Sequence, residues 1–215
     1  MNSRQAISGI KPPTRRQPQR DAMRTRLLTA ARKLLARSGV AALSLRAVAR
    51  AAGCVPGNVY VYFPGKHALL SAVVEESFAR LHDALATVTA PAAAPVLARI
   101  RRAMHLYVEF GLSHPADYEV AFMLGRARAE NGVPSSHLRP AFRVLETLLE
   151  EAESPGLRRT GSRSAVAQSI WASLHGLTSL LITHRNFPWV ERQTLVRMHI
   201  ASILAGHFDE RKVQE

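Results

Sequence analysis

The chain has 215 residues, with 29 Lys and Arg against 16 Asp and Glu, and a formal net charge of +13. This length supports a core without disulfides or metals, and a single cysteine excludes an intramolecular disulfide framework. No apolar run approaches the roughly 18 residues of a membrane helix. Residues 1–20 lack the apolar segment of a secretory signal. We therefore expect a folded protein of a reducing compartment.

The positive charge is concentrated in the first third of the chain. Residues 1–66 contain 13 Lys and Arg and one acid, Asp21, whereas residues 67–215 contain 16 basic and 15 acidic residues. This asymmetry indicates a polyanion-binding module beside an almost neutral domain. Duplex DNA, RNA and an anionic membrane surface are the candidate polyanions. A basic surface kept for solubility is the alternative.

The apolar pattern predicts an all-α protein. Residues 1–19 are polar and proline-containing, which indicates a flexible basic arm. Apolar residues then recur at spacings of three and four, and no sustained two-residue alternation or internal repeat occurs. Proline and glycine separate the segments. The expected helices cover residues 21–38, 45–52, 56–63, 66–88, 96–113, 116–130, 136–153, 165–183 and 190–208.

Residues 44–63, SLRAVARAAGCVPGNVYVYF, have the spacing of a helix-turn-helix. Such a motif needs a small residue where its helices come closest, a glycine in the turn and an apolar residue that fixes the second helix. Ala49, Gly53 and Val59 occupy these places, and Ser44 is a good N-cap for the first helix. The second helix would then lie in a DNA major groove, which is about 12 Å wide.

The segment GCVPGNVYVYFPGKHALL, Gly53 to Leu70, resembles the TetR/AcrR family of bacterial transcriptional regulators. The resemblance implies a helix-turn-helix DNA-binding domain at residues 20–66. It also implies a helical effector-binding and dimerisation domain at residues 67–215. The family often has Ser or Thr where this chain has Val55, so the cap of the second helix is in doubt. Cys54 stands where the family usually has a small apolar residue, so we expect it to be buried rather than redox-active.

The resemblance also implies which residues approach DNA. Asn58 can pair with an adenine edge, Gly57 allows close approach, and Val55 can contact a thymine methyl group. Val59 and Phe63 are expected in the core, and for Tyr60 both DNA contact and packing stay open. The residues expected to contact the DNA, either at the bases or at the phosphate backbone, are Ser44, Arg46, Val55, Pro56, Gly57, Asn58, Tyr60, Tyr62 and Lys66. For Arg15, Arg16 and Arg20, a minor-groove contact and a solvated tail are both open.

The segment Trp171 to Gly176, WASLHG, resembles the Trp–x–x–x–His–Gly (WHG) signature of one subfamily. On this helix the small residues Ala172, Gly176, Ser179 and Thr183 share a narrow sector. We expect this stripe to face a second copy of the chain and the Trp171/His175 side to face the interior. The last helix would complete the dimer interface through Leu195, Met198, Ala201, Ser202 and Ala205.

The interior of the C-terminal domain is the expected effector site. Ligand pockets are mostly apolar with few polar anchors, and an ordinary helical core has the same composition. For His175, ligand contact and a satisfied buried histidine are both open. The candidate lining residues are Met104, Tyr107, Phe110, Tyr118, Phe122, Met123, Trp171 and His175.

These features predict a cytoplasmic, homodimeric transcriptional regulator, most simply a repressor that a small-molecule effector releases from a palindromic operator. We expect no membrane partner and no cofactor. Enzyme motifs such as Gly-x-Ser-x-Gly or a P-loop do not occur, and His105 with Glu109 offers too few ligands for a metal. The alternatives are an effector-independent architectural DNA-binding protein and, far behind, a small-molecule enzyme.

Overall fold

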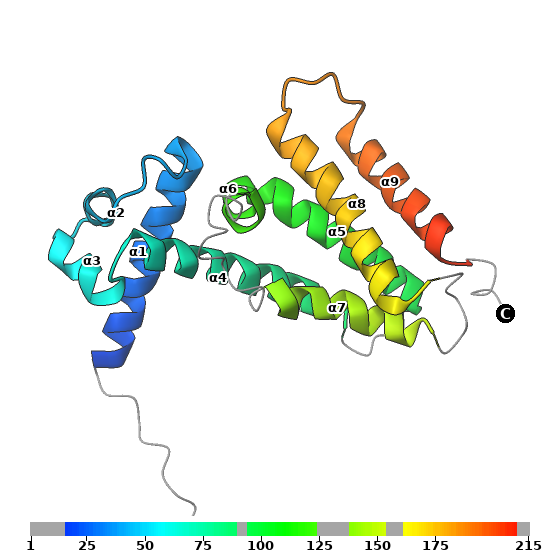
Figure 1. Ribbon diagram of the computed structural model, residues 1–215, viewed down its shortest axis with the longest axis horizontal. Helices are drawn as coiled ribbons and strands as arrows, with labels where there is room; N and C mark the ends of the chain where they lie inside the picture. Colours follow the sequence, from blue (N-terminus) through cyan, green and yellow to red (C-terminus); the bar gives the residue numbers. More distant parts are fainter. Residues whose placement is uncertain (1–15, 90–93, 124–137, 154–160, 210–215) are drawn as a thin grey trace, which may run out of the picture. The chain divides into compact units, whose positions relative to one another are not determined.

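The computed structural model describes residues 16–89, 94–123, 138–153 and 161–209, and every regular element in these ranges is helical (Figure 1). The predicted all-α fold is therefore confirmed. The chain forms two compact units that divide between Leu69 and Leu70. The helices are α1 (Arg16–Ser38), α2 (Leu45–Ala52), α3 (Pro56–Tyr62), α4 (Lys66–Ala86), α5 (Val96–Ser113), α6 (Pro115–Tyr118), α7 (Leu138–Glu151), α8 (Arg163–Thr183) and α9 (Arg192–His207).

The helix bounds differ by more than two residues from the expectation at two places. α1 begins at Arg16, so residues 16–19 are helical although they were expected in the arm. Pro18 fits there because proline is tolerated in the first turn of a helix. The helix expected over residues 116–130 is instead the short α6, followed by a π-helical turn, η1 (Glu119–Met123). The rest of that expectation and of the basic arm lies outside the described residues.

Unit 1 is built from α1, α2 and α3 around one apolar core. α1 packs on α2 and α2 packs on α3. The Arg24 guanidinium also lies 5.8 Å from the ring centre of the buried Phe63, within the range of a cation–π contact. This contact joins α1 to the residue that ends α3. The core side chains include Leu27, Leu28, Ala31, Leu43, Val48, Ala49 and Val59.

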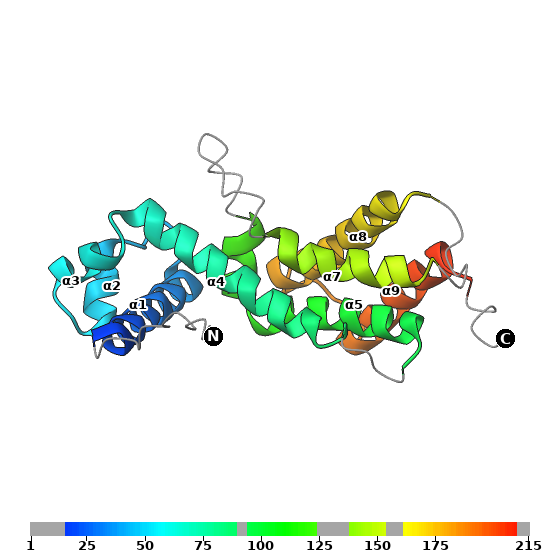
Figure 2. The same ribbon diagram turned by 90° about the horizontal axis from the view of Figure 1, so that it is seen from below.

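Unit 2 is organised around α5, which packs against α6 (Figure 1) and against α7, α8 and α9 (Figure 2). The closest approach is at Gly111 of α5. A Cβ atom there would lie 2.4 Å from the Cγ2 of Thr178 and 2.9 Å from the Cδ2 of Tyr118. Thr178 and Tyr118 are fully buried. Glycine at this position therefore lets α5 approach α8 and α6 closely.

Of the described helices, α8 alone is long and apolar enough in composition to cross a membrane. The expectation that no apolar segment approaches that length is therefore wrong for the stretch of α8. The physical reason is that α8 packs on α5, α7 and α9, so apolar residues occur on several of its sides. A single core helix of this kind passes the same length and composition test and is weak grounds for a membrane span.

The close approach at Gly111 gives a stability prediction. Gly111→Ala removes a poor helix former from α5, but the added methyl group overlaps Thr178 and Tyr118. We expect the overlap to dominate and to lower the free energy of unfolding by about 1–3 kcal/mol. Gly206→Ala in α9 is the control, because a Cβ there has no heavy atom within 4 Å. Denaturant unfolding of both variants checks this, and equal stability of the two would contradict it.

Candidate functional site

The turn between α2 and α3 positions the first candidate site. Before α2, the Oγ of Ser44 accepts a hydrogen bond from the Ala47 N–H at 3.1 Å and caps the helix. After α2, Gly53 has a φ of +64° and the Cys54 N–H donates to the Ala49 carbonyl at 2.9 Å. Glycine adopts this left-handed conformation at the lowest energetic cost, so α2 ends here and the chain turns sharply towards α3.

One face of α3 is fixed in the core and the other faces solvent. Val59 is 0% exposed and Ala49 of α2 is 1% exposed. Both residues that were expected to hold the two helices of the motif together are therefore buried. Tyr60 is 55% exposed, which favours availability for contact over packing. Val61, which the sequence did not single out, is 66% exposed. The predicted DNA-contacting residues on this outer side, all exposed, are Val55, Pro56, Gly57, Asn58 and Tyr60.

Val55 precedes α3 without capping it. Its backbone is extended, as at an N-cap, but no side-chain hydrogen bond reaches the first turn, and the side chain is 64% exposed. Pro56 at the first helical position has no N–H, so it removes one of the donors that a cap would satisfy. Cys54, expected to be buried, is only half-buried.

Lys66 at the start of α4 has a structural contact as well as its predicted role at DNA. Its Nζ donates to the carbonyl of Val40 at 2.9 Å and connects α4 to the segment after α1. An ammonium group has three donors, so two remain for a phosphate. Lys66 and Arg46 are exposed, and Tyr62 is half-buried.

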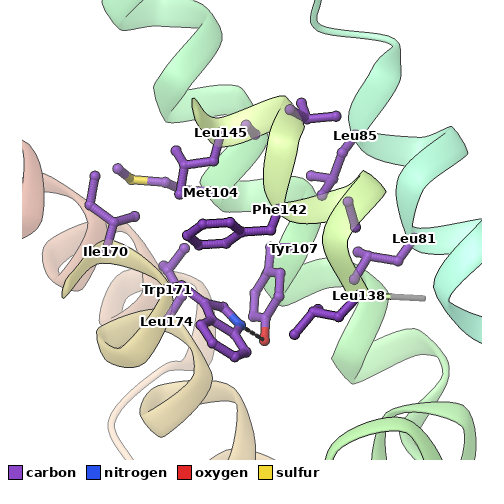
Figure 3. Close-up of a pocket in the computed structure, with 13 residues that line it drawn as sticks. Leu81, Leu85, Met104, Tyr107, Leu138, Phe142, Leu145, Ile170, Trp171 and Leu174 are labelled. Atoms are coloured by element: carbon purple, nitrogen blue, oxygen red, sulfur yellow. Dashed lines mark hydrogen bonds between the residues drawn. The ribbon is translucent and has the colours of Figure 1, made fainter. Parts of the chain in front are cut away.

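A second candidate site is an apolar cavity in unit 2. Figure 3 shows that side chains from α4, α5, α7 and α8 converge on it. Its volume of about 40 Å³ exceeds the space needed for one water but is well below the roughly 300 Å³ of a small ligand pocket. The lining residues, none of which is charged, are Leu81, Leu85, Ala103, Met104, Tyr107, Leu138, Ala141, Phe142, Val144, Leu145, Ile170, Trp171 and Leu174.

A chain of polar side chains borders this cavity. The Trp171 Nε1–H donates to the Tyr107 hydroxyl at 3.2 Å, and the Tyr107 and Tyr118 hydroxyls are 3.3 Å apart. The Tyr118 hydroxyl lies 2.6 Å from Nδ1 of His175. Burial lowers the pKa of His175, which favours a neutral ring whose Nδ1 accepts from Tyr118. Burial also raises the pKa of Tyr107 to about 12 and raises that of Tyr118, so both remain hydroxyl donors.

The predicted effector residues fall into three groups in the structure. Met104, Tyr107 and Trp171 line the cavity. Tyr118, His175 and Phe122 lie in the adjoining cluster, where the Phe122 ring centre is 4.7 Å from that of Tyr118. Phe110 instead stacks on His114, and the side chain of Met123 lies outside those described.

Sequence reasoning missed most of the aliphatic lining and Phe142. Leu81 and Leu85 were recognised as the apolar side of a helix, but only packing shows that this side borders a cavity. The i, i+4 spacing of these two residues on α4 and of Ala141 and Leu145 on α7 was the available signal. That spacing is common to every helix in a core, so it does not distinguish a cavity from close packing.

A partly buried ion pair connects α6 to α4 within unit 2. Asp117 is 6% exposed, and its carboxylate pairs with the Arg80 guanidinium. The other carboxylate oxygen accepts from the Ser77 hydroxyl at 3.3 Å. A buried carboxylate requires such partners, and removing one of them is costly. Asp117 directly precedes Tyr118, so the polar chain at the cavity and the ion pair to α4 share α6.

A chain that combines a strongly basic unit, whose helix-turn-helix has an exposed second helix, with a helical unit that holds an apolar cavity has the features of a DNA-binding regulator. Comparison with known families agrees. Residues 27–73 match the family "Bacterial regulatory proteins, tetR family", and residues 100–203 match "Tetracyclin repressor-like, C-terminal domain". The chain belongs to the TetR family of transcriptional regulators, and the predicted family is confirmed.

Solved structures show the same fold. A protein of unknown function from Rhodococcus sp. RHA1 has 25% identity and a TM-score of 0.76, over 87% of this chain and 96% of that one. The fatty acid degradation regulator FadR from Bacillus halodurans has 18% identity and a TM-score of 0.75, over 86% of this chain and 95% of that one. A TetR family regulator from Marinobacter aquaeolei VT8 has 19% identity and a TM-score of 0.70, over 91% of this chain and 100% of that one. No curated protein matches the chain.

The uncapped start of α3 gives a prediction. Val55→Ser supplies the oxygen that α3 lacks, and we expect the free energy of unfolding to rise by about 0.5–1 kcal/mol. Ser44→Ala is the opposite change at the capped start of α2 and should lower it by about 1 kcal/mol. Thermal unfolding of the two full-length variants measures both effects. A loss of stability in Val55→Ser would show that the valine side chain is needed where it stands.

Proposed function

We propose that this regulator is a cytoplasmic repressor that binds a palindromic operator as a homodimer and is released by a small-molecule effector. The observation that carries the proposal is the outer side of α3, which is exposed on a unit holding nearly all the excess positive charge. A polyanion is attracted to such a unit, and an exposed helix fits the major groove. We propose no enzymatic activity and no membrane partner.

The α3 residues are assigned to base contacts. The Asn58 side chain can donate to and accept from an adenine edge, and the exposed Val55 methyl groups fit a thymine methyl. At Gly57 a Cβ would meet no protein atom within 4 Å, so space for packing does not explain the glycine. We assign it to close approach of the DNA. Pro56 and Tyr60 are exposed as well.

Other residues are assigned to the phosphate backbone. Lys66 retains two ammonium donors, and the Tyr62 hydroxyl and Arg46 guanidinium are further donors. Ser44 begins α2, whose first N–H groups favour an anion. These contacts would set the register of α3 in the groove without reading sequence.

The dimer is assigned to α8 and α9. On α8, Ala172 and Thr183 are exposed while Gly176 and Ser179 are half-exposed, and Trp171 and His175 bond inward. On α9, Met198 is 64% exposed, and Ala201, Ser202 and Ala205 are exposed beside it. Small side chains on neighbouring helices (Figure 1) support close packing of a second copy in an isologous interface.

Effector release is assigned to the connection between the cavity and α4. A ligand that displaces Tyr107 or Trp171 changes the hydrogen bonds of Tyr118. Tyr118 adjoins Asp117, which pairs with Arg80 on α4, and α4 continues into the DNA-binding unit. Such a ligand shifts the population towards a form that no longer fits the operator, by as much as its affinity for the two forms differs.

Selection from random duplex DNA tests the DNA-binding role. We expect a two-fold symmetric motif whose half-sites are separated by one helical turn or a multiple of it. Asn58→Ala should relax preference at one symmetric position and cost about 1–3 kcal/mol per half-site. Lys66→Ala should weaken binding to all sequences and reduce the salt slope by about one per protomer.

Two outcomes would contradict these assignments. Uniform weakening by Asn58→Ala would contradict a base-reading role. Selection without any preferred motif would favour the architectural alternative. Because Lys66 also bonds to Val40, thermal unfolding of Lys66→Ala separates a folding defect from a lost phosphate contact.

The dimer assignment has a test of its own. Ala172→Trp places a large side chain in the proposed interface, and two-fold symmetry makes the change occur twice per dimer. At about 1–3 kcal/mol per site, we expect the dimer Kd to rise by roughly 30-fold or more. Ala98→Trp, at an exposed alanine of α5, is the matched control. Sedimentation velocity measures both, and an unchanged dimer in Ala172→Trp would remove the assignment.

A further inference from the structure

The cavity of unit 2 suits only the uncharged part of a ligand. Its lining has no charged side chain, and the polar groups that border it, on Tyr107 and Trp171, already bond to each other. A charged group placed inside would lose its hydration without gaining a partner of opposite charge. Any charged group of the ligand must therefore lie outside the cavity.

A cationic hollow adjoins the cavity on the outer side of the same two helices. Along α4, Leu81 and Leu85 line the cavity, whereas His82 of the next position lines the hollow. Along α7, Arg139 and Arg143 line the hollow, and Val144 lines both spaces. The seam between α4 and α7 thus has an apolar inner side and a basic outer side.

The two arginines of this hollow differ in their acidic surroundings: no acidic side chain lines the hollow itself, but Arg143 also lines a second hollow with Glu146, Glu150 and Glu153. Arg139 and Arg143 are four residues apart on α7, where side chains are neighbours, so their like charges repel. Among the described residues neither forms an ion pair, whereas Arg163 nearby pairs with Glu150 and Glu153. An anion between the two guanidinium groups would remove this repulsion and gain charge-assisted hydrogen bonds.

We infer that the effector is an anionic amphiphile, with an apolar body in the cavity and a carboxylate or phosphate held by Arg139 and Arg143. The inference rests on the proposed function, because it names the ligand class of the proposed effector site. His82 adds its Nε2 on the α4 side of the hollow, since its Nδ1 already lies 3.4 Å from the Asp83 carboxylate. Since the cavity holds only about 40 Å³, the apolar body must widen it by moving side chains such as Phe142 and Leu138.

Calorimetric titration of the full-length protein tests this with three probes that share one hydrocarbon chain. The probes are decanoate, decyl phosphate and decanol, each used below the concentration at which it aggregates. We expect at least one of the two anions to bind about tenfold more tightly than decanol, since two exposed charge contacts contribute about that factor together. The anion that binds more tightly and releases the selected operator identifies the head group as carboxylate or phosphate.

Matched variants separate the head contact from general charge effects. The double variant R139A/R143A should bind the anions about as weakly as decanol and leave decanol binding unchanged. The double variant R101A/R102A removes the same charge from exposed positions of α5 and should keep the preference for anions. Ala103→Leu narrows the cavity and should weaken all three probes together.

Three results would overturn the inference. They are equal binding of decanol and both anions to the unaltered protein, equal losses in the two double variants, and no binding of any probe. Each of these leaves the proposed function standing if random DNA selection still yields a symmetric motif. Failure of that selection would overturn the proposed function, whichever probe binds.

Discussion

The packing of α2 on α3, in which Ala49 and Val59 are buried, is the constraint on which the DNA-binding unit depends. Both side chains are buried, and the left-handed turn at Gly53 brings their helices together over a few residues. With Val59 fixed inward, the helical period places Gly57 and Val61 on the opposite side of α3 and Asn58 and Tyr60 on its two flanks, all exposed. A larger residue at Ala49 would push α3 away from α2 and alter the direction of every side chain it presents.

In unit 2 the main constraint is different, because several polar side chains in its interior need hydrogen-bond partners. Trp171, Tyr107, Tyr118 and His175 satisfy one another in a single chain of hydrogen bonds. Buried polar groups are costly when a partner is lost, so a ligand that disturbs one member disturbs the others. This dependence gives a small apolar cavity a physical means of influencing α6 and, through Asp117, α4.

The seam between α4 and α7 has an apolar cavity on its inner side and basic side chains on its outer side. Its inner side is apolar and only partly filled, and its outer side has two adjacent arginines without ion-pair partners among the described residues. A ligand that is apolar at one end and anionic at the other would stabilise both.

The sequence by itself determined the all-α class, the helix-turn-helix and the family, because local spacing and capping residues decide these features. The turn at Gly53, the cap at Ser44 and the missing cap at Val55 were all readable along the chain. Only the tertiary structure decided that Phe142 and five leucines border a cavity, that Phe110 stacks elsewhere, and that Asp117 pairs with Arg80. Those contacts join residues far apart in sequence, and a helical period states which side of a helix is apolar without stating what that side meets.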